Sequence, residues 1–402
     1  MRKQSYINTD CIKGFRIKLY PTDSQKIEIN RNIQLSRAIY NLGLEMQNNV
    51  YKNGGKYIRY FDMITEFSRM RNNDEDKYWM KEISIGTIRE VLQNLDNAFM
   101  RFFNKQNNHP KFKSRKYSKK TFPVRSDRTT IYGKYIRISG LKDPMILAKN
   151  HNIPENKRMY NTTISFDGYN YWFSCTIESE KVCMHNIEKS EPVGIDVGIV
   201  NMITTSDGVF YKFSDSKKYE KRLKRQQRRL SKDYNRYFNQ SLDTRTKYED
   251  IQKSKNHYKR LEKRFKTISK MRNKRLNDIH TATKQIVSKN PSAIVIENIS
   301  VREQLRDKWF RKCVNVNQVM YYEIHRQLKY KAANRDIPVI TAEKGYASSQ
   351  ICSRCGNHGY LKHRIFRCSH CGYKEDRDLN AAYNLRNLAI TSLPNLQMAT
   401  SA

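Results

Sequence analysis

The first regular pattern along the chain is an alternation of apolar and basic residues over 11–22, which ends at Pro21. Such an alternation predicts a half-buried β-strand. Between residues 24 and 107 the apolar positions instead recur every three or four residues, for example at Ile29 and Ile33. This period predicts a group of helices, each with one apolar face.

Residues 104–120 form a basic, polar linker, in which Pro110 excludes a regular helix. Residues 121–183 are predicted to form β structure, with two strands joined at Asp167-Gly168, a favoured hairpin pair. An aromatic cluster follows this pair. We interpret it as the core of a small barrel or half-barrel, with stacking on nucleotides as the alternative; its members are Tyr169, Tyr171, Trp172 and Phe173.

The second half of the chain alternates short apolar strands with long helical segments. The predicted strands lie in 191–213, with a turn at Asp207-Gly208, in 292–300 and in 337–343; the predicted helices lie in 217–287, with a break around 238–246, and in 316–335. This order of strands and helices indicates a layered α/β domain.

Net charge is the strongest compositional signal. The chain has 77 Lys and Arg against 39 Asp and Glu, a formal charge of +38 over 402 residues. A field of this size favours a polyanionic partner and salt-dependent binding over a merely solubilising surface. No apolar run approaches the roughly 18 residues of a spanning helix, and the first residues lack a signal-peptide core. The expected partner is therefore a nucleic acid and not a membrane.

The basic residues are densest at the start of the helical segment 217–287, where ten of twenty consecutive residues are Lys or Arg. A charge run is most often a solvated helix face, but one sign along a whole helix favours a nucleic-acid contact. The candidate contacts are two residues of this helix and three of the basic linker: Lys224, Arg228, Lys111, Lys113 and Arg115.

Four of the eight cysteines form two CxxC pairs with the spacing of a structural zinc site: Cys352, Cys355, Cys368 and Cys371. A glycine follows each pair, and its freedom to adopt a positive φ lets backbone amides turn toward the sulfurs. Four thiolates leave no open position on the metal, so Zn²⁺ is expected to be structural. The nearby histidines are interpreted as surface or nucleic-acid-facing residues: His358, His363 and His370. The other cysteines are scattered, as in a reduced intracellular protein: Cys11, Cys175, Cys183 and Cys313.

Three carboxylates occupy places where an uncompensated charge is costly. Asp196 lies in an apolar strand, Glu297 at the end of another, and Asp378 at the start of the last helix. If they converge, they form a site for two hard divalent cations, which suits in-line hydrolysis of a phosphodiester.

Each acid also has a structural alternative, and spacing alone leaves these alternatives open. Asp196 can bond to the glycine-rich backbone around it, and Glu297 can pair with a Lys or Arg of the basic hairpin. Asp378 can cap the last helix, although Asp376 is better placed for that role.

These motifs resemble a known family. "GIDVG" at 194–198, "IVIEN" at 294–298 and the ending "CxxCG…CxxCG…DRDLNAA" are similar to the split RuvC-type nuclease of the TnpB proteins. Those proteins are RNA-guided endonucleases encoded by insertion sequences and are related to compact type V CRISPR effectors. The likeness extends to "FRIKLYPTDSQ", "HPKFKSRK" and "YKAANRDIPVITAEKGYASSQICSRCG", so it covers most of the chain.

The resemblance implies a multidomain α+β protein with an N-terminal β wedge interrupted by a helical recognition lobe. An α/β RNase H-fold (RuvC-like) nuclease domain with an inserted four-cysteine zinc ribbon would follow. The implied domains are the first wedge strand 1–20, the recognition lobe 21–118, the barrel-like wedge part 119–188, the nuclease domain 189–347 with the basic hairpin 217–287, the zinc ribbon 348–375, and the last nuclease segment and tail 376–402.

By the same resemblance, Asp196, Glu297 and Asp378 are the acids of the three nuclease segments and hold two Mg²⁺ ions. The zinc ribbon would shape the mouth of this site. The implied activity is cleavage of double-stranded target DNA that pairs with a guide RNA and carries a short flanking motif. This activity would maintain a mobile element. The protein is expected to act as a monomer in the prokaryotic cytoplasm, at the nucleoid.

Two alternatives stay open. One is an RNA-guided DNA-binding protein without cleavage, which the intact acids disfavour. The other is a compact type V CRISPR effector, whose chemistry is the same in another genomic setting. A zinc-ribbon protein that only binds RNA leaves Asp196 and Glu297 on apolar strands unexplained.

Overall fold

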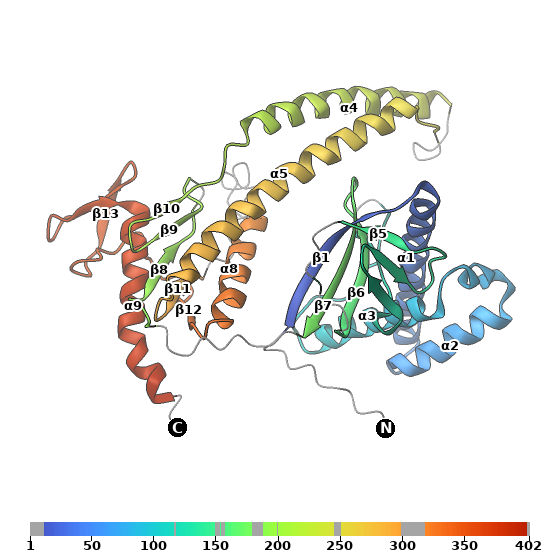
Figure 1. Ribbon diagram of the computed structural model, residues 1–402, viewed down its shortest axis with the longest axis horizontal. Helices are drawn as coiled ribbons and strands as arrows, with labels where there is room; N and C mark the ends of the chain where they lie inside the picture. The colour runs from blue at the N-terminus through green and yellow to red at the C-terminus, as the bar shows by residue number, and fades with distance from the viewer. Residues whose placement is uncertain are drawn as a thin grey trace. The chain divides into compact units, whose positions relative to one another are not determined.

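Figure 1 shows the computed structural model, which describes residues 12–115, 118–148, 153, 157–178, 188–198, 200–244, 251–298 and 318–399. The chain divides into two compact units, residues 1–180 and 181–402. Each has its own sheet and hydrophobic core. Three of the scattered cysteines lie outside the described residues: Cys11, Cys183 and Cys313.

The first unit contains a seven-stranded sheet in the order β2-β6-β7-β1-β5-β4-β3, in which every pair is antiparallel. The strand predicted over 11–22 is confirmed as β1, and it lies in the middle of the sheet. The strands are β1 (Ile12–Tyr20), β2 (Lys120–Pro123), β3 (Thr129–Tyr132), β4 (Tyr135–Ile138), β5 (Met145–Leu147), β6 (Met159–Phe166) and β7 (Tyr171–Glu178).

The predicted hairpin at Asp167-Gly168 is confirmed between β6 and β7. Asp167 closes the turn, because its Oδ1 accepts hydrogen bonds from the amides of Tyr169 and Asn170. Tyr171 and Phe173 are buried in the core of the sheet. The core interpretation of the aromatic cluster is therefore confirmed for these two residues.

Helices are inserted between β1 and β2, as the apolar period over 24–107 predicts: α1 (Asp23–Lys52), α2 (Tyr60–Asn73), the short 3₁₀ helix η2 (Glu75–Glu82) and α3 (Ile85–Phe103). Thr22 and Gln25 form a reciprocal capping box that starts α1 directly after Pro21. Helices α1 and α3 pack closely at Gly43, where a Cβ would lie 2.9 Å from Leu95 Cδ2.

The second unit contains a five-stranded mixed sheet in the order β10-β9-β8-β11-β12. Strands β8, β11 and β12 are parallel, and β9 and β10 are antiparallel to their neighbours. All three predicted strand regions are confirmed. The strands are β8 (Val193–Asp196), β9 (Ile203–Thr205), β10 (Phe210–Tyr211), β11 (Ile294–Ile296) and β12 (Val339–Thr341), and the helices are α4 (Lys217–Asp243), α5 (Lys255–Ser288), α8 (Gln318–Ala333) and α9 (Arg377–Ala399).

Both faces of this sheet are covered, because successive side chains of a strand point to opposite sides. Ile294 and Ile296 of β11 belong to the core that α5 and α8 complete. Ala293 and Val295 belong to a second core, to which α9 contributes Leu385 and Ala389. The layered α/β arrangement predicted from the order of elements is confirmed.

Helix α9 lies almost against the backbone of β8. A Cβ at Gly194 would lie 2.0 Å from the carbonyl oxygen of Ala382 and 2.4 Å from the amide nitrogen of Arg386. Only glycine fits this approach. The small residues Ala381 and Ala382 are buried in the same contact. The sequence "LNAAYNL" thus serves to bring the start of α9 close to the end of β8.

The two predicted helices of the basic segment are confirmed, but the break between them lies later than the predicted 238–246, since α4 continues to Asp243 and α5 begins at Lys255. Packing against the start of α5 explains the difference. The Tyr237 hydroxyl donates to Ser254 Oγ at 3.1 Å and accepts from the Ser254 amide at 2.9 Å. These contacts hold the last turns of α4 to α5 where local sequence indicates a loop.

A third, three-stranded antiparallel sheet follows β12 and consists of β13 (Gly359–Lys362), β14 (Ile365–Cys368) and β15 (Lys374–Asp376). Its first strand pair is a hairpin whose turn holds His363 at a positive φ of 58°. Strand β15 leads directly into α9. Within the described part of the chain, no helix is long and apolar enough to cross a membrane.

Candidate functional site

The three carboxylates predicted to form a site meet at one edge of the five-stranded sheet. Asp196 ends β8, and Glu297 directly follows the end of β11. Ile195 pairs with Ile296 in the parallel register of these adjacent strands, so the two acids that come next in each strand lie side by side. Asp378 comes from the first turn of α9. A Cβ at Gly198 would lie 3.9 Å from an oxygen of Asp196 and 3.9 Å from one of Asp378.

The convergence raises the pKa values of two of these acids. Burial raises the pKa of Asp196 well above its usual range, and the negative charges of Glu297 and Asp378 raise it further. Burial also raises the pKa of Glu297, and Asp378 adds to the rise, while a hydrogen bond from Ser348 and the charge of Arg377 oppose it. Such a like-charge cluster needs a cationic ligand to be fully ionised.

The structural alternatives do not account for these acids. Asp376, not Asp378, caps α9, because its Oδ1 accepts from the amides of Asp378 and Leu379 at 2.9 and 3.2 Å. Glu297 is hydrogen-bonded to Ser348 instead of being paired with the basic hairpin. Among the described residues, Asp196 has no side-chain hydrogen bond or ion pair. The sequence-based preference for Asp376 as the cap is confirmed.

Several residues that contact the acids could not be predicted from the sequence. Asn201 Nδ2 donates to Asp378 Oδ2 at 3.1 Å, and both residues are buried. Arg364, in the turn between β13 and β14, forms an ion pair with the same carboxylate. The amide of Arg377 also donates to the Arg364 carbonyl at 2.8 Å. The small sheet therefore contributes a guanidinium directly to the acid cluster.

Tyr321 of α8 is another neighbour that the sequence does not reveal. It is buried, and its pKa is raised to about 12, first by burial and then by the negative charges of Asp196, Glu297 and Asp378. Its phenol therefore stays protonated at neutral pH beside the acids. The only sequence signal is its place on the apolar face of a helix, which many core tyrosines share.

The four cysteines with zinc spacing are brought together. Their sulfurs all lie within 4.8 Å of one another, with Cys352 and Cys371 3.6 Å apart and Cys355 and Cys368 3.5 Å apart. A tetrahedron of thiolates with Zn–S distances of about 2.3 Å has edges of about 3.8 Å. Gly356 and Gly372 have φ values of +77° and +70°, as predicted. The donor set therefore fits a structural Zn²⁺.

Two asparagines on α9 fix the segment of the first cysteine pair to this helix. Asn380 accepts from the Ser353 amide at 3.0 Å and donates to the Ile351 carbonyl at 2.8 Å. Asn384 donates to the carbonyls of Ser348 and Ile351, each at 2.7 Å. The hydroxyl of Ser348 in turn donates a hydrogen bond to Glu297. The spacing of these asparagines on one helix face is the signal that sequence reasoning missed.

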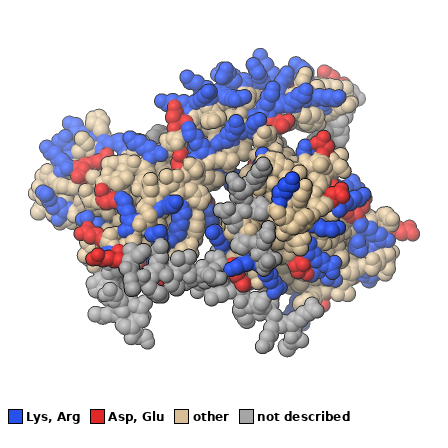
Figure 2. Space-filling view, in the orientation of Figure 1, with Lys and Arg blue, Asp and Glu red and all other residues tan. Residues whose placement is uncertain are grey.

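The candidate nucleic-acid contacts differ in their surroundings. Lys111 and Arg115 are exposed, whereas Lys113 Nζ lies 3.5 Å from the centroid of the Tyr40 ring, and burial lowers the pKa of Lys113 to about 8. Lys224 and Arg228 are exposed on α4. Figure 2 shows Lys and Arg side chains spread over α4 and α5.

Two family models match parts of the chain. The model described as "Cas12f1-like, TNB domain" matches residues 321–385, and the model described as "Helix-turn-helix domain", named for OrfB of IS605, matches residues 11–56. The second segment consists here of strand β1 and the single long helix α1. The first holds the cysteines, Arg364 and Asp378.

Two curated relatives cover nearly the whole chain. A Streptomyces pristinaespiralis protein is 24% identical over 93% of this chain and 88% of its own length; an Escherichia coli K12 protein, InsQ, is 27% identical over 93% and 91%. Both bear the provisional name of RNA-guided DNA endonuclease. The solved "Cas12f1-sgRNA-target DNA complex" matches at 14% identity with a TM-score of 0.55, covering 90% of this chain and 83% of that chain.

The chain thus has a mixed α/β multidomain fold and is similar to proteins named RNA-guided DNA endonucleases and to Cas12f1-like proteins. The resemblance predicted from its motifs is confirmed.

Proposed function

We propose that this protein is an RNA-guided endonuclease that hydrolyses phosphodiester bonds of target DNA beside a short flanking motif. The observation that carries the proposal is the convergence of Asp196, Glu297 and Asp378 at one sheet edge, with the pKa values of the first two raised. A cluster of acids alone repels DNA. Its presence in a chain of charge +38 therefore favours a catalytic role over a role in DNA binding.

The nuclease is of the RuvC-like, RNase H-fold kind, and its three acids would hold two Mg²⁺ ions. Carboxylate oxygens are the ligands that Mg²⁺ prefers. Such ions, held by these acids, would supply an activated water and stabilisation of the leaving oxygen. The residues around them orient the ligands: the Ser348 hydroxyl holds Glu297, and the Asn201 amide holds Asp378.

Arg364 and the zinc ribbon have a joint role in this proposal. The ribbon, held by Zn²⁺ on its four cysteines and by Asn380 and Asn384 on α9, carries Arg364 to the third acid. A guanidinium in this place can meet a phosphate oxygen of the DNA strand as it enters. This is the physical reason for a zinc site beside a carboxylate cluster.

The partners are a guide RNA and double-stranded target DNA, as in the complex named for Cas12f1. The proposed domains follow the motif-based boundaries: wedge 1–20 and 119–188, recognition lobe 21–118, nuclease 189–347 and 376–402, and ribbon 348–375. The insertion of α1, α2 and α3 between β1 and β2 of one sheet supports the interrupted wedge. The Cas12f1-like segment leaves a compact CRISPR effector as a second candidate with the same chemistry.

The test is to co-express the protein with its native flanking DNA and to sequence the RNA that purifies with it. The complex is then given plasmids that carry a guide-matched target next to randomised bases, with Mg²⁺ or with EDTA. We expect cleavage that depends on the match, on Mg²⁺ and on one set of flanking bases. Matched binding without cleavage in Mg²⁺ would contradict the proposal and favour a guided DNA-binding protein.

A further inference from the structure

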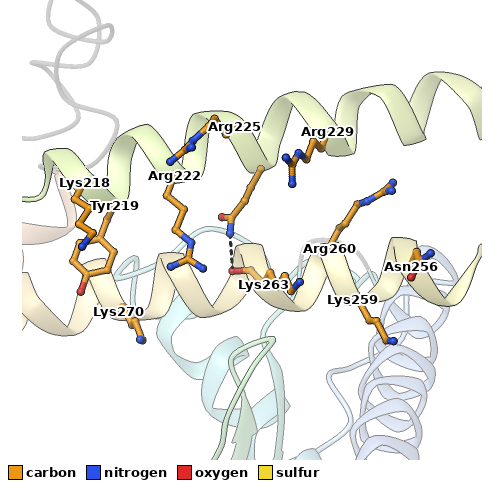
Figure 3. Close-up of a pocket in the computed structure, with 11 residues that line it drawn as sticks. Lys218, Tyr219, Arg222, Arg225, Arg229, Asn256, Lys259, Arg260, Lys263 and Lys270 are labelled. Atoms are coloured by element: carbon orange, nitrogen blue, oxygen red, sulfur yellow. Dashed lines mark hydrogen bonds between the residues drawn. The ribbon is translucent and has the colours of Figure 1, made fainter.

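A second candidate site lies in the groove between α4 and α5, the two helices between Asp196 and Glu297 in the chain. Figure 3 shows this groove, a cavity of about 750 Å³ lined by side chains of both helices. Eight of the eleven residues that line it are Lys or Arg, and the others are Tyr219, Gln226 and Asn256. No described acidic residue lines the groove.

Ion pairs hold the two helices together at the ends of the groove. Toward the α4–α5 connection, Asp233 pairs with Arg260 and lies 3.3 Å from His257 Nδ1. At the other end, Arg275 lies 3.5 Å from Glu220. Between these ends a hydrogen bond from Gln226 Nε2 to the Lys263 carbonyl, at 3.3 Å, crosses between the helices (Figure 3).

Within the groove, like charges face one another. Arg222, Arg225 and Arg229 recur on one face of α4, opposite Lys259 and Lys263 of α5 (Figure 3). None of these five has an ion pair in the described part of the chain. Facing cations repel, and the repulsion costs free energy unless an anion lies between them.

We propose that this groove binds a single strand of the guide RNA by its sugar–phosphate backbone, with the facing cations of α4 and α5 as phosphate ligands. The inference rests on the proposed function for the presence of guide RNA. Packed helices lie about 8–10 Å apart axis to axis, so a strand would lie along the open side of the groove and not between the helix axes. Tyr219, within the groove, offers a ring on which a base can stack.

RNA fits the site better than DNA, because the cations of α4 and α5 repel one another as soon as the protein folds and need an anion at that stage. The guide RNA is bound before any target is met, whereas a DNA strand is free only after the target has opened. An extended row of phosphates also matches the row of three arginines, spaced three and four residues apart along α4.

The test compares two full-length variants of equal charge. The groove variant is Arg222→Gln/Arg225→Gln/Arg229→Gln. Its matched control is Lys221→Gln/Lys232→Gln/Arg236→Gln, which removes three exposed cations of the same helix that do not line the groove. RNA affinity of each apoprotein is measured from 0.05 to 0.3 M salt, and circular dichroism checks that each is folded.

We expect the groove variant to bind the co-purified guide RNA at least about tenfold more weakly. The slope of log affinity against log salt should fall by about 2, since three phosphate contacts to a single strand are lost. The control variant should keep more of the RNA affinity and more of the salt dependence. Ultraviolet cross-linking of the wild-type protein to RNA, without target DNA, should label Tyr219.

Equal losses in the two variants would overturn the inference, as would unchanged RNA binding combined with weaker target binding, which would assign the groove to DNA. If the groove variant does not fold, Lys259→Gln/Lys263→Gln replaces it, with weaker RNA binding and a fall of about 1.4 in the salt slope expected for two lost phosphate contacts. A wild-type protein that binds no RNA would instead overturn the proposed function.

Discussion

At the scale of single residues, the acid cluster is arranged so that its charges are costly without cations. The Asp196 side chain has no hydrogen bond among the described residues, and its pKa is raised by burial, then by Glu297 and Asp378. An acid whose pKa is higher in the folded state destabilises the fold as pH rises through that pKa. Cations bound at the site would relieve this cost.

Replacing Asp196 with Asn should therefore stabilise the metal-free protein at pH 7.5 while reducing its response to Mg²⁺. The melting temperature should rise by about 2–4 °C for each kcal/mol gained. Thermal unfolding in EDTA and in Mg²⁺ measures both effects. Asp62→Asn, at an exposed position of α2, is the control and should change neither. An equal Mg²⁺ response of wild type and Asp196→Asn would contradict a metal site at this residue.

Ser348 gives a second prediction at this scale. Its hydroxyl bonds to Glu297 and lowers the pKa of that carboxyl against the effect of burial. Ser348→Ala should raise the pKa of Glu297, so that the acid limb of the cleavage pH profile moves to higher pH. Cleavage on that limb should fall about 2–10-fold. Ser348→Thr keeps a hydroxyl and should restore the profile. A uniform loss at every pH would indicate a merely structural role.

At the scale of elements, the site depends on how closely α9 approaches β8. A methyl group at Gly194 would meet the α9 backbone at 2.0 Å, so Gly194→Ala must push the helix and Asp378 away from Asp196. We expect a loss of about 1–3 kcal/mol in unfolding free energy and of most cleavage activity. Gly14→Ala is the control, since a Cβ there has no atom within 4 Å. Denaturant unfolding that leaves the two variants equal would contradict this packing.

The zinc ribbon is the other element on which the site depends, because it carries Arg364 to Asp378. Elemental analysis should find one zinc per chain, and Cys355→Ser/Cys368→Ser should lose it. Loss of zinc should abolish cleavage while leaving the fold of the first unit intact by hydrogen exchange. Full cleavage by a zinc-free variant would show that the ribbon does not position this part of the site.

Strands and helices could be predicted largely from local patterns, as β1 and the Asp167-Gly168 hairpin illustrate. The end of α4 could not, because contacts of Tyr237 with α5 decide it. The acids and cysteines stand out through their motifs. Asn201 and Arg364 do not, since their importance lies in side-chain contacts with Asp378 that only the folded chain creates. Local pattern contains no information on such contacts.

At the scale of the whole molecule, a strongly basic chain contains the cluster of three carboxylates. The charge of +38 suits a guide RNA and its target, and base pairing, not the protein, would read the target sequence. Asp196, Glu297 and Asp378 place negative charge within this positive field. Three carboxylates near the path of a polyanion would weaken its binding unless they hold cations.

The most direct test of the central claim is guided cleavage by the purified RNA–protein complex in Mg²⁺, comparing wild type with Asp196→Ala. Binding of matched DNA is measured on the same samples. The account predicts equal or tighter DNA binding by the variant, with cleavage at least about 1,000-fold slower. Cleavage by Asp196→Ala at the wild-type rate would place the chemistry outside this acid cluster and contradict the account.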